Sequence, residues 1–301
     1  MRMGYDQHWN FGVQQSLMAN TVFELNYVGN KGSHLASTNN FNFPNAGPGD
    51  IQSRRPYPRF SNAQFYTSDG ASIYHSLQAK VERRLSSGLW YLASYTFSKN
   101  IIWQPTPAAG GNTGFERALS GSDIPHNFSL SAGYQLPVGR SRRFMRQAGA
   151  VPNALLGGWQ MQGVLSVRTG RPFTPTISRD VANNGIGAQR PNRTASGALD
   201  NPTVDRWFDT GAFALPPSFT YGNSGGNIIR EDGLRSLDCS VFKEFLVREK
   251  WKIQFRAESF NLTNTPSFLG PSGVVDTAAG ARITATSVNP RQLQAALKFI
   301  F

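Results

Sequence analysis

The last eleven residues constrain the fold of this chain more than any other stretch. They read R-Q-L-Q-A-A-L-K-F-I-F, from Arg291 to Phe301. Side chains alternate between the two faces of a β-strand, so one face carries Leu, Ala and Phe while the other carries mostly Gln and Lys. Such a strand invites aggregation in water, whereas a closed barrel in lipid can use it, because its apolar face meets acyl chains. The alternative is a buried last strand of a soluble β-sandwich.

The terminal strand resembles the C-terminal signal of Gram-negative outer-membrane barrels. Leu297, Phe299 and Phe301 carry the resemblance in this sequence. It implies a location in the cell outer membrane, contact with outer-membrane lipid, and recognition of these residues by the outer-membrane barrel assembly machinery.

Eight further segments alternate apolar and polar residues in the same way, so we expect about nine strands. Short and long connections alternate between them, which is typical of bacterial barrels with short periplasmic turns and long external loops. The predicted fold is therefore all-β, an antiparallel up-and-down transmembrane β-barrel, present as a fragment of about nine strands. The nine segments are Asp6–Leu17, Thr21–Gly29, Ala71–Leu85, Leu89–Ser98, Pro125–Leu136, Gly158–Thr169, Leu234–Val247, Lys250–Asn261 and Arg291–Phe301.

Four long segments rich in Gly, Pro, Asn and Ser are predicted to be external loops. A fifth connection, Pro137–Gly157, contains room for a short amphipathic helix, while tight turns are expected at Ser86–Gly88 and Arg248–Glu249. The sequence W-F-D-T-G-A-F, from Trp207 to Phe213, is typical of a packed turn inside a loop. The four predicted loops are Asn30–Gly70, Lys99–Ile124, Gly170–Gly233 and Leu262–Pro290.

The composition of the two strand faces favours a membrane barrel over a sandwich. Only 16% of the residues are charged, and 12% are aromatic. The aromatic residues gather near segment ends on the apolar faces, as in the aromatic girdles of barrels, whereas the polar faces would suit a wet lumen. The candidate lumen-facing residues are Gln78, Lys80, Arg84, Gln160, Gln162, Arg168, Lys252, Gln254, Arg256 and Glu258.

Composition and spacing argue against several other function classes. The net charge is +12, but Arg and Lys form no continuous stripe, so we expect no nucleic-acid partner. The four histidines are scattered, and Cys239 is the single cysteine, so neither a metal site nor a cofactor site is expected. No Ser-His-Asp arrangement stands out, and we expect no enzymatic activity. An outer-membrane protease or lipase barrel and a soluble sandwich adhesin remain the alternative functions.

Three longer motifs resemble the C-terminal barrel of TonB-dependent outer-membrane receptors, particularly the Oar-like group that has a carboxypeptidase-regulatory-like domain. They are N-F-S-L-S-A-G-Y-Q-L-P-V-G-R (Asn127–Arg140), G-G-W-Q-M-Q-G-V-L-S-V-R-T-G-R-P-F-T (Gly157–Thr174) and R-A-E-S-F-N-L-T-N-T-P-S-F (Arg256–Phe268). The resemblance implies a 22-stranded barrel with an N-terminal plug, and energised uptake of a ligand.

We therefore expect residues 1–301 to be the C-terminal part of one outer-membrane barrel domain. The first ten residues lack the apolar stretch of a signal peptide, and an odd strand number does not suit a single-chain bacterial barrel. The signal peptide, the regulatory-like domain, the plug and the first strands would then be missing. On this hypothesis, TonB is reached only through that N-terminal part. The transported ligand has no recognisable code in the loops.

Overall fold

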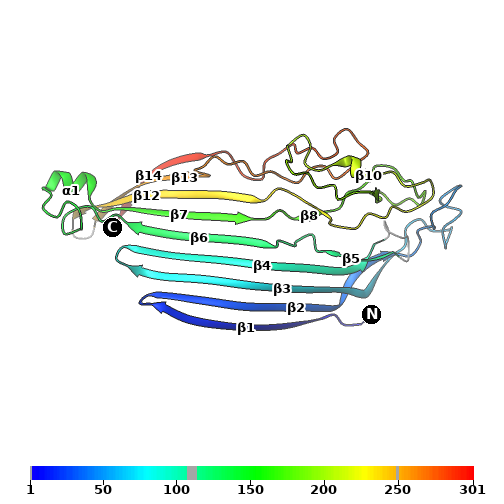
Figure 1. Cartoon of the computed structure of the whole chain (residues 1–301), viewed down its shortest axis with the longest axis horizontal. Coiled ribbons are helices and arrows are strands. Elements are labelled where there is room, and N and C mark those ends of the chain that lie inside the picture. Colours follow the sequence, from blue (N-terminus) through cyan, green and yellow to red (C-terminus); the bar gives the residue numbers. More distant parts are fainter. Residues whose placement is uncertain (1, 107–113, 249–250) are drawn as a thin grey trace.

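The computed structural model describes residues 2–106, 114–248 and 251–301, and one antiparallel sheet dominates it (Figure 1). Among the described residues, nine strands follow one another across the sheet in chain order, and a further strand, β5, pairs with β4. The prediction of about nine up-and-down strands is confirmed. The strands are β1 (Tyr5–Met18), β2 (Thr21–Asn40), β3 (Gln64–Ser86), β4 (Leu89–Pro105), β5 (Phe115–Leu119), β6 (His126–Gln135), β7 (Trp159–Arg168), β12 (Leu234–Arg248), β13 (Trp251–Phe260) and β14 (Gln292–Ile300).

The register joins the alternating side chains into a continuous apolar face. Cross-strand partners share a face of the sheet, so a row of partners shows what that face presents. One such row crosses five strands and consists of Leu25, Ala79, Tyr95, Phe128 and Val167.

No second layer covers this apolar face among the described residues. Phe11 is 73% exposed, Leu297 65% and Phe299 68%. A soluble sandwich would bury these side chains between two sheets. The sandwich alternative is therefore wrong, and the exposed face is the one that lipid would cover in a membrane barrel.

The main sheet is open. In the described part of the chain, β1 pairs only with β2, and β14 pairs only with β13. Every residue of β1 is exposed. The sheet thus has the strand order of a barrel wall without the closure of a complete barrel.

The connections divide between the two ends of the sheet (Figure 1). The turn end carries two-residue turns after β1 and β3 and the C-terminus, whereas the loop end carries residues 41–63, 169–233 and 261–291. At the turn after β3, Ser87 and Gly88 both have positive φ, of 52° and 82°. Two such residues form the two-residue turn that matches the right-handed twist of a hairpin, so the tight turn predicted there is confirmed.

Two predicted loops are shorter than expected. The predicted loop Asn30–Gly70 is partly wrong, because β2 continues to Asn40 and β3 already begins at Gln64. Asn40 and Gln64 are register partners in this extension. Backbone pairing continues here although the apolar-polar alternation stops. Strand residues outside the hydrocarbon layer contact water on both faces, so they need no apolar face.

The second predicted loop, Lys99–Ile124, is wrong for a similar reason. β4 extends to Pro105, and β5 returns beside it, with Ile101 opposite Leu119. Residues 107–113 of this predicted loop lie outside the described part of the chain, as do residues 249–250 of the turn predicted at Arg248–Glu249.

The remaining elements are short. A seven-residue helix, α1 (Ala150–Leu156), lies at the turn end, where a short helix is predicted. No helix in the described residues has both the length and the apolar character needed to cross a membrane. The loop end holds a 3₁₀ turn, η3 (Thr210–Ala212), and four two-residue strands: β8 (Pro172–Phe173), β9 (Asn192–Arg193), β10 (Phe213–Ala214) and β11 (Ile229–Arg230).

Candidate functional site

The face of the sheet opposite the apolar rows is largely polar from β1 to β12. One row of register partners shows this directly, because it contains no apolar residue over seven strands. The row consists of Gln14, Glu24, Lys80, Ser94, Ser129, Ser166 and Ser236.

The first group of polar contacts on this face centres on Lys80. Its Nζ lies 3.1 Å from Glu24 Oε2 and 3.8 Å from Glu82 Oε2. Gln14 donates a hydrogen bond of 3.1 Å to Glu24 Oε1. Gln14, Glu24 and Arg84 line one shallow pocket on this face. These side chains are partly exposed, so each pair contributes less than about 1 kcal/mol to stability and remains available to another partner.

A second group lies on β12 and β13. Glu244 accepts hydrogen bonds from Lys252 Nζ (3.3 Å) and Gln254 Nε2 (3.2 Å). Arg256 Nη1 donates to Glu258 Oε1 at 3.2 Å. The face therefore carries alternating positive and negative groups with unused hydrogen-bonding capacity.

The structure places all ten sequence-predicted candidates on this polar face, spread across the sheet rather than in one cluster. Gln78 and Arg168 belong to one row, while Gln162 and Glu258 flank Ser240 in another. Glu24 and Glu244, the acidic partners of the lysines, were not among the candidates, although their alternation phase indicates the same face.

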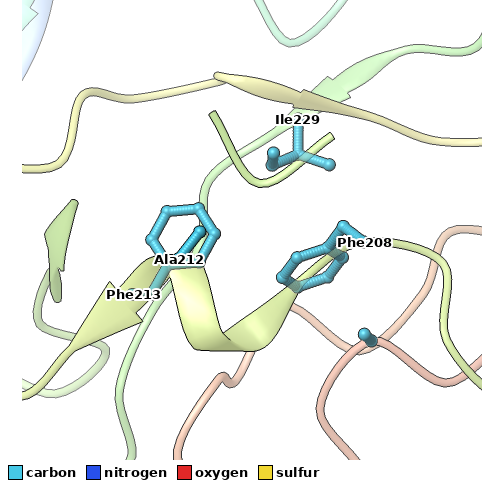
Figure 2. Packing of buried hydrophobic residues seen from close by; sticks show 5 residues of the cluster. Phe208, Ala212, Phe213 and Ile229 are labelled. Carbon is cyan, nitrogen blue, oxygen red and sulfur yellow. The ribbon is translucent and has the colours of Figure 1, made fainter. Parts of the chain in front are cut away.

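The loop end forms a separate packed cluster above the sheet. Phe208 is 1% exposed, and its ring lies 6.0 Å from that of Phe213 (Figure 2). The ring of Phe173 lies 5.7 Å from that of Phe208. Ala212 and Ile229 complete the apolar contact (Figure 2). The packed turn predicted at Trp207–Phe213 is thus confirmed, with η3 as its central turn. This loop cluster has its own small core, so its surface has a defined shape.

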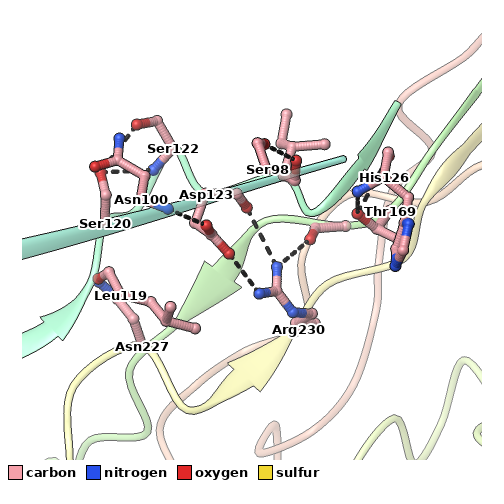
Figure 3. Close-up of polar contacts among 12 residues, drawn as sticks. Ser98, Asn100, Leu119, Ser120, Ser122, Asp123, His126, Thr169, Asn227 and Arg230 are labelled. Carbon is pink, nitrogen blue, oxygen red and sulfur yellow. Dashed lines mark hydrogen bonds and ion pairs between the residues drawn. The ribbon is translucent and has the colours of Figure 1, made fainter. Parts of the chain in front are cut away.

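An ion pair with a buried carboxylate joins the loop cluster to the sheet. Asp123 is 1% exposed, and its carboxylate accepts hydrogen bonds from Arg230 Nη2 and from the backbone N–H of Asn100, both at 2.6 Å (Figure 3). Arg230 also donates to the carbonyl oxygen of Gly170 at 3.1 Å. The pair therefore connects the segment after β5, the end of β7 and β11.

A second buried ion pair makes a similar connection. Arg190 donates two hydrogen bonds to Glu116, at 2.8 and 2.6 Å, and a third to the carbonyl oxygen of Ser224. The Arg190 side chain is 7% exposed and that of Glu116 17%. Burial acts to raise the pKa of the Glu116 carboxyl, but hydrogen bonds from Arg190 and the Gly226 N–H, with the arginine charge, hold this pKa below its ordinary value.

Buried asparagines organise the remaining loops. The Asn42 side chain is fully buried, accepts from the Tyr57 N–H, and donates to three carbonyl oxygens of residues 57–61. Arg54 donates to the backbone carbonyl oxygen of Asn183. The side-chain amide of Asn183 donates to the carbonyl oxygen of Gly47. These polar contacts join the loop 41–63 to the loop cluster.

Two of the histidines, His75 and His126, each contact a tyrosine hydroxyl. His75 Nδ1 lies 2.7 Å from the Tyr27 hydroxyl, and His126 Nδ1 lies 2.7 Å from that of Tyr95. Over the described ranges, no group of three His, Cys, Asp or Glu side chains has the geometry of a metal site.

Comparison with known proteins places the whole chain in one family. The family model described as "Outer membrane beta barrel domain" matches residues 1–294. No curated protein matches the sequence.

Solved structures are similar to this chain at low sequence identity. The chain is similar to the outer membrane transporter YddB from Escherichia coli, with 13% identity and a TM-score of 0.52. The match covers 99% of this chain and 33% of YddB, so the chain spans about a third of that transporter. FpvA of P. aeruginosa, in a pyoverdine–iron complex, is 12% identical with a TM-score of 0.47, over 97% of this chain and 26% of FpvA.

Proposed function

Since the chain belongs to the outer membrane β-barrel domain family and lies in the cell outer membrane, we propose that it is the wall segment of a TonB-dependent receptor. This receptor captures a ligand at its external loops and takes it up with energy supplied through TonB. The fold shared with the transporter YddB supports a transport role. The proposal extends to the Oar-like group, whose motifs the segments 127–140, 157–174 and 256–268 resemble.

The observation that carries the proposal is the packed loop cluster at the loop end. A purely structural barrel wall needs no buried core above the lipid, yet Phe208, Asp123 and Arg190 are buried there. A preorganised surface binds a ligand without first paying the entropy of ordering its loops. The loop cluster, at the external end, is thus the part of the chain that would hold the ligand.

The polar face would line the lumen of the complete barrel. Its amides and paired charges can form hydrogen bonds with a plug domain or with a passing ligand. The two groups around Lys80 and Glu244 lie toward the turn end, which would be the periplasmic end. Candidates at that end, such as Lys80 and Lys252, would contact the plug, whereas Arg168, the last residue of β7, lies at the loop end.

The C-terminal strand would serve assembly of the barrel. Leu297 and Phe299 stand opposite Phe255 and Ile253 of β13, and Phe301 is 97% exposed. These residues form an apolar face on an edge strand, which suits recognition by the barrel assembly machinery. The proposal includes no catalytic step.

Binding of the complete protein to TonB tests this function without knowledge of the ligand. The complete gene product, solubilised in detergent, is expected to retain the purified C-terminal domain of TonB on an affinity column. Retention should persist in an Arg190→Ala variant, because the loop cluster lies at the opposite end of the barrel. A folded complete protein that does not retain TonB would contradict energised uptake.

A further inference from the structure

The connection between β6 and β7 departs from the pattern of the turn end. The described turns after β1 and β3 contain two residues each, whereas this connection runs from Leu136 to Gly158 and includes α1 (Figure 1). We call residues 136–158 the rim segment. It has internal order, since the N–H groups of Gly139 and Phe144 donate to the carbonyl oxygens of Phe144 and Pro137.

Side chains from the apolar face fasten the rim segment to the sheet. Lys243 is 4% exposed, and its Nζ donates to the carbonyl oxygens of Asn153 (3.3 Å) and Ala154. Trp159 Nε1 donates to the carbonyl oxygen of Leu155 at 2.9 Å. Trp159 and Lys243 are register partners in a row that continues to apolar residues of β13 and β14. The end of α1 is therefore continuous with the surface that lipid covers.

The rim segment presents both apolar and basic side chains to its surroundings. Val151 is 69% exposed, Leu155 65% and Leu156 56%. Its sequence also contains four arginines and no acidic residue. All four arginines are exposed; they are Arg140, Arg142, Arg143 and Arg146.

We propose that the rim segment lies in the periplasmic leaflet as an interfacial anchor for anionic phospholipids. Val151, Leu155 and Leu156 insert among the acyl chains, and the arginines bind the lipid phosphates. Interfacial helices combine these two kinds of residue, and basic groups near a bilayer surface attract anionic lipids. Water would be a poor environment for three large apolar side chains on a helix already fixed to the lipid-facing rows.

An environment-sensitive fluorophore on Leu155→Cys tests the insertion. The complete protein, made free of other cysteines by changes that include Cys239→Ser, is reconstituted in nanodiscs of phosphatidylcholine and phosphatidylglycerol. A label on Leu215→Cys, in the loop cluster, is the control. Dithionite should reduce the label at position 155 about tenfold more slowly than the one at 215, since acyl chains shield it from an aqueous reagent. Equal reduction rates at positions 155 and 215 would overturn the proposal, because they would show that the rim segment is exposed to water.

The charge component is tested separately with the triple variant R142Q/R143Q/R146Q. Shielding of the label at position 155 should be stronger with phosphatidylglycerol present than with phosphatidylcholine alone, and this difference should disappear in the triple variant. A difference that persists in the triple variant, or none in the parent, would overturn phosphate binding. Heat-modifiable migration on gels confirms that each variant barrel is folded, and neither readout depends on transport.

Discussion

The spanning sheet and the loop cluster place their apolar side chains in opposite ways. In the sheet, the large apolar side chains are exposed, as with Phe11 and Leu297, and the polar side chains pair on the other face. In the loop cluster, Phe208 is buried among other apolar residues, and Asp123 and Arg190 are buried there in ion pairs. The sheet therefore depends on lipid for its apolar burial, whereas the loop cluster is stabilised as a small water-soluble domain would be.

This difference separates the consequences of substitutions in the two regions. A substitution that removes a buried contact in the loop cluster should destabilise the loops and leave the barrel wall intact. A substitution that places a charge on the apolar face should destabilise the barrel wall and leave the loop cluster intact. Four experiments test this separation, and hydrogen–deuterium exchange of the complete protein in nanodiscs measures both regions at once.

The largest expected effect is that of Phe208→Ala. Truncation of a fully buried aromatic ring leaves a cavity and costs about 4 kcal/mol of local stability. Exchange should accelerate in the loop cluster and stay unchanged in β3 and β4. Phe219→Ala is the control, because that ring is 43% exposed and its loss should change little. Equal exchange in the two variants would show that the loop cluster has no apolar core of its own.

Arg190→Ala should cost somewhat less, about 3 kcal/mol, because it leaves the Glu116 carboxylate buried without its cation. The matched control is Arg206→Ala, which removes the exposed pair with Asp209 and should cost less than about 1 kcal/mol. Faster exchange at 186–193 and 222–227 in the first variant alone would support this assignment. An effect that spreads through β6 and β7 would instead show that the two regions are one cooperative unit.

Leu165→Arg and Ser166→Arg test the sheet in the same way. These neighbours face opposite sides of β7, since Leu165 pairs with Leu130 and Ser166 with Ser129. An arginine on the lipid face should destabilise the barrel by about 2 kcal/mol, whereas one on the polar face should be tolerated. The measurement is the denaturant midpoint for loss of heat-modifiable migration. A larger cost for the serine variant would reverse the assignment of the two faces.

The sheet could be predicted from the sequence because its determinants are local. Alternation is a property of neighbouring residues, and it correctly indicated nine strands and the two faces. The contacts of the loop cluster could not be predicted in this way, because Glu116 and Arg190 are 74 residues apart, and Asp123 and Arg230 are 107 apart. No local pattern marks such partners. The extension of β2 to Asn40 was missed for a related reason, since pairing outside lipid leaves no alternation to detect.

The smallest expected effect is a pH dependence confined to the loop cluster. Interaction with Arg190 lowers the pKa of Glu116 in the folded state, so the ionised carboxylate contributes stability above the ordinary glutamate value of 4.5. That contribution should be lost as the pH falls below 4.5 and through the lowered pKa, because the protonated acid no longer pairs with the guanidinium. Exchange in the loop cluster should therefore increase in acid, after correction for the intrinsic rate. Glu116→Gln should remove this pH dependence while keeping one acceptor oxygen near Arg190. An acid response of equal size in that variant would assign the titration to another carboxylate, and one that appears first in β12–β14 would place the acid-sensitive contacts in the sheet.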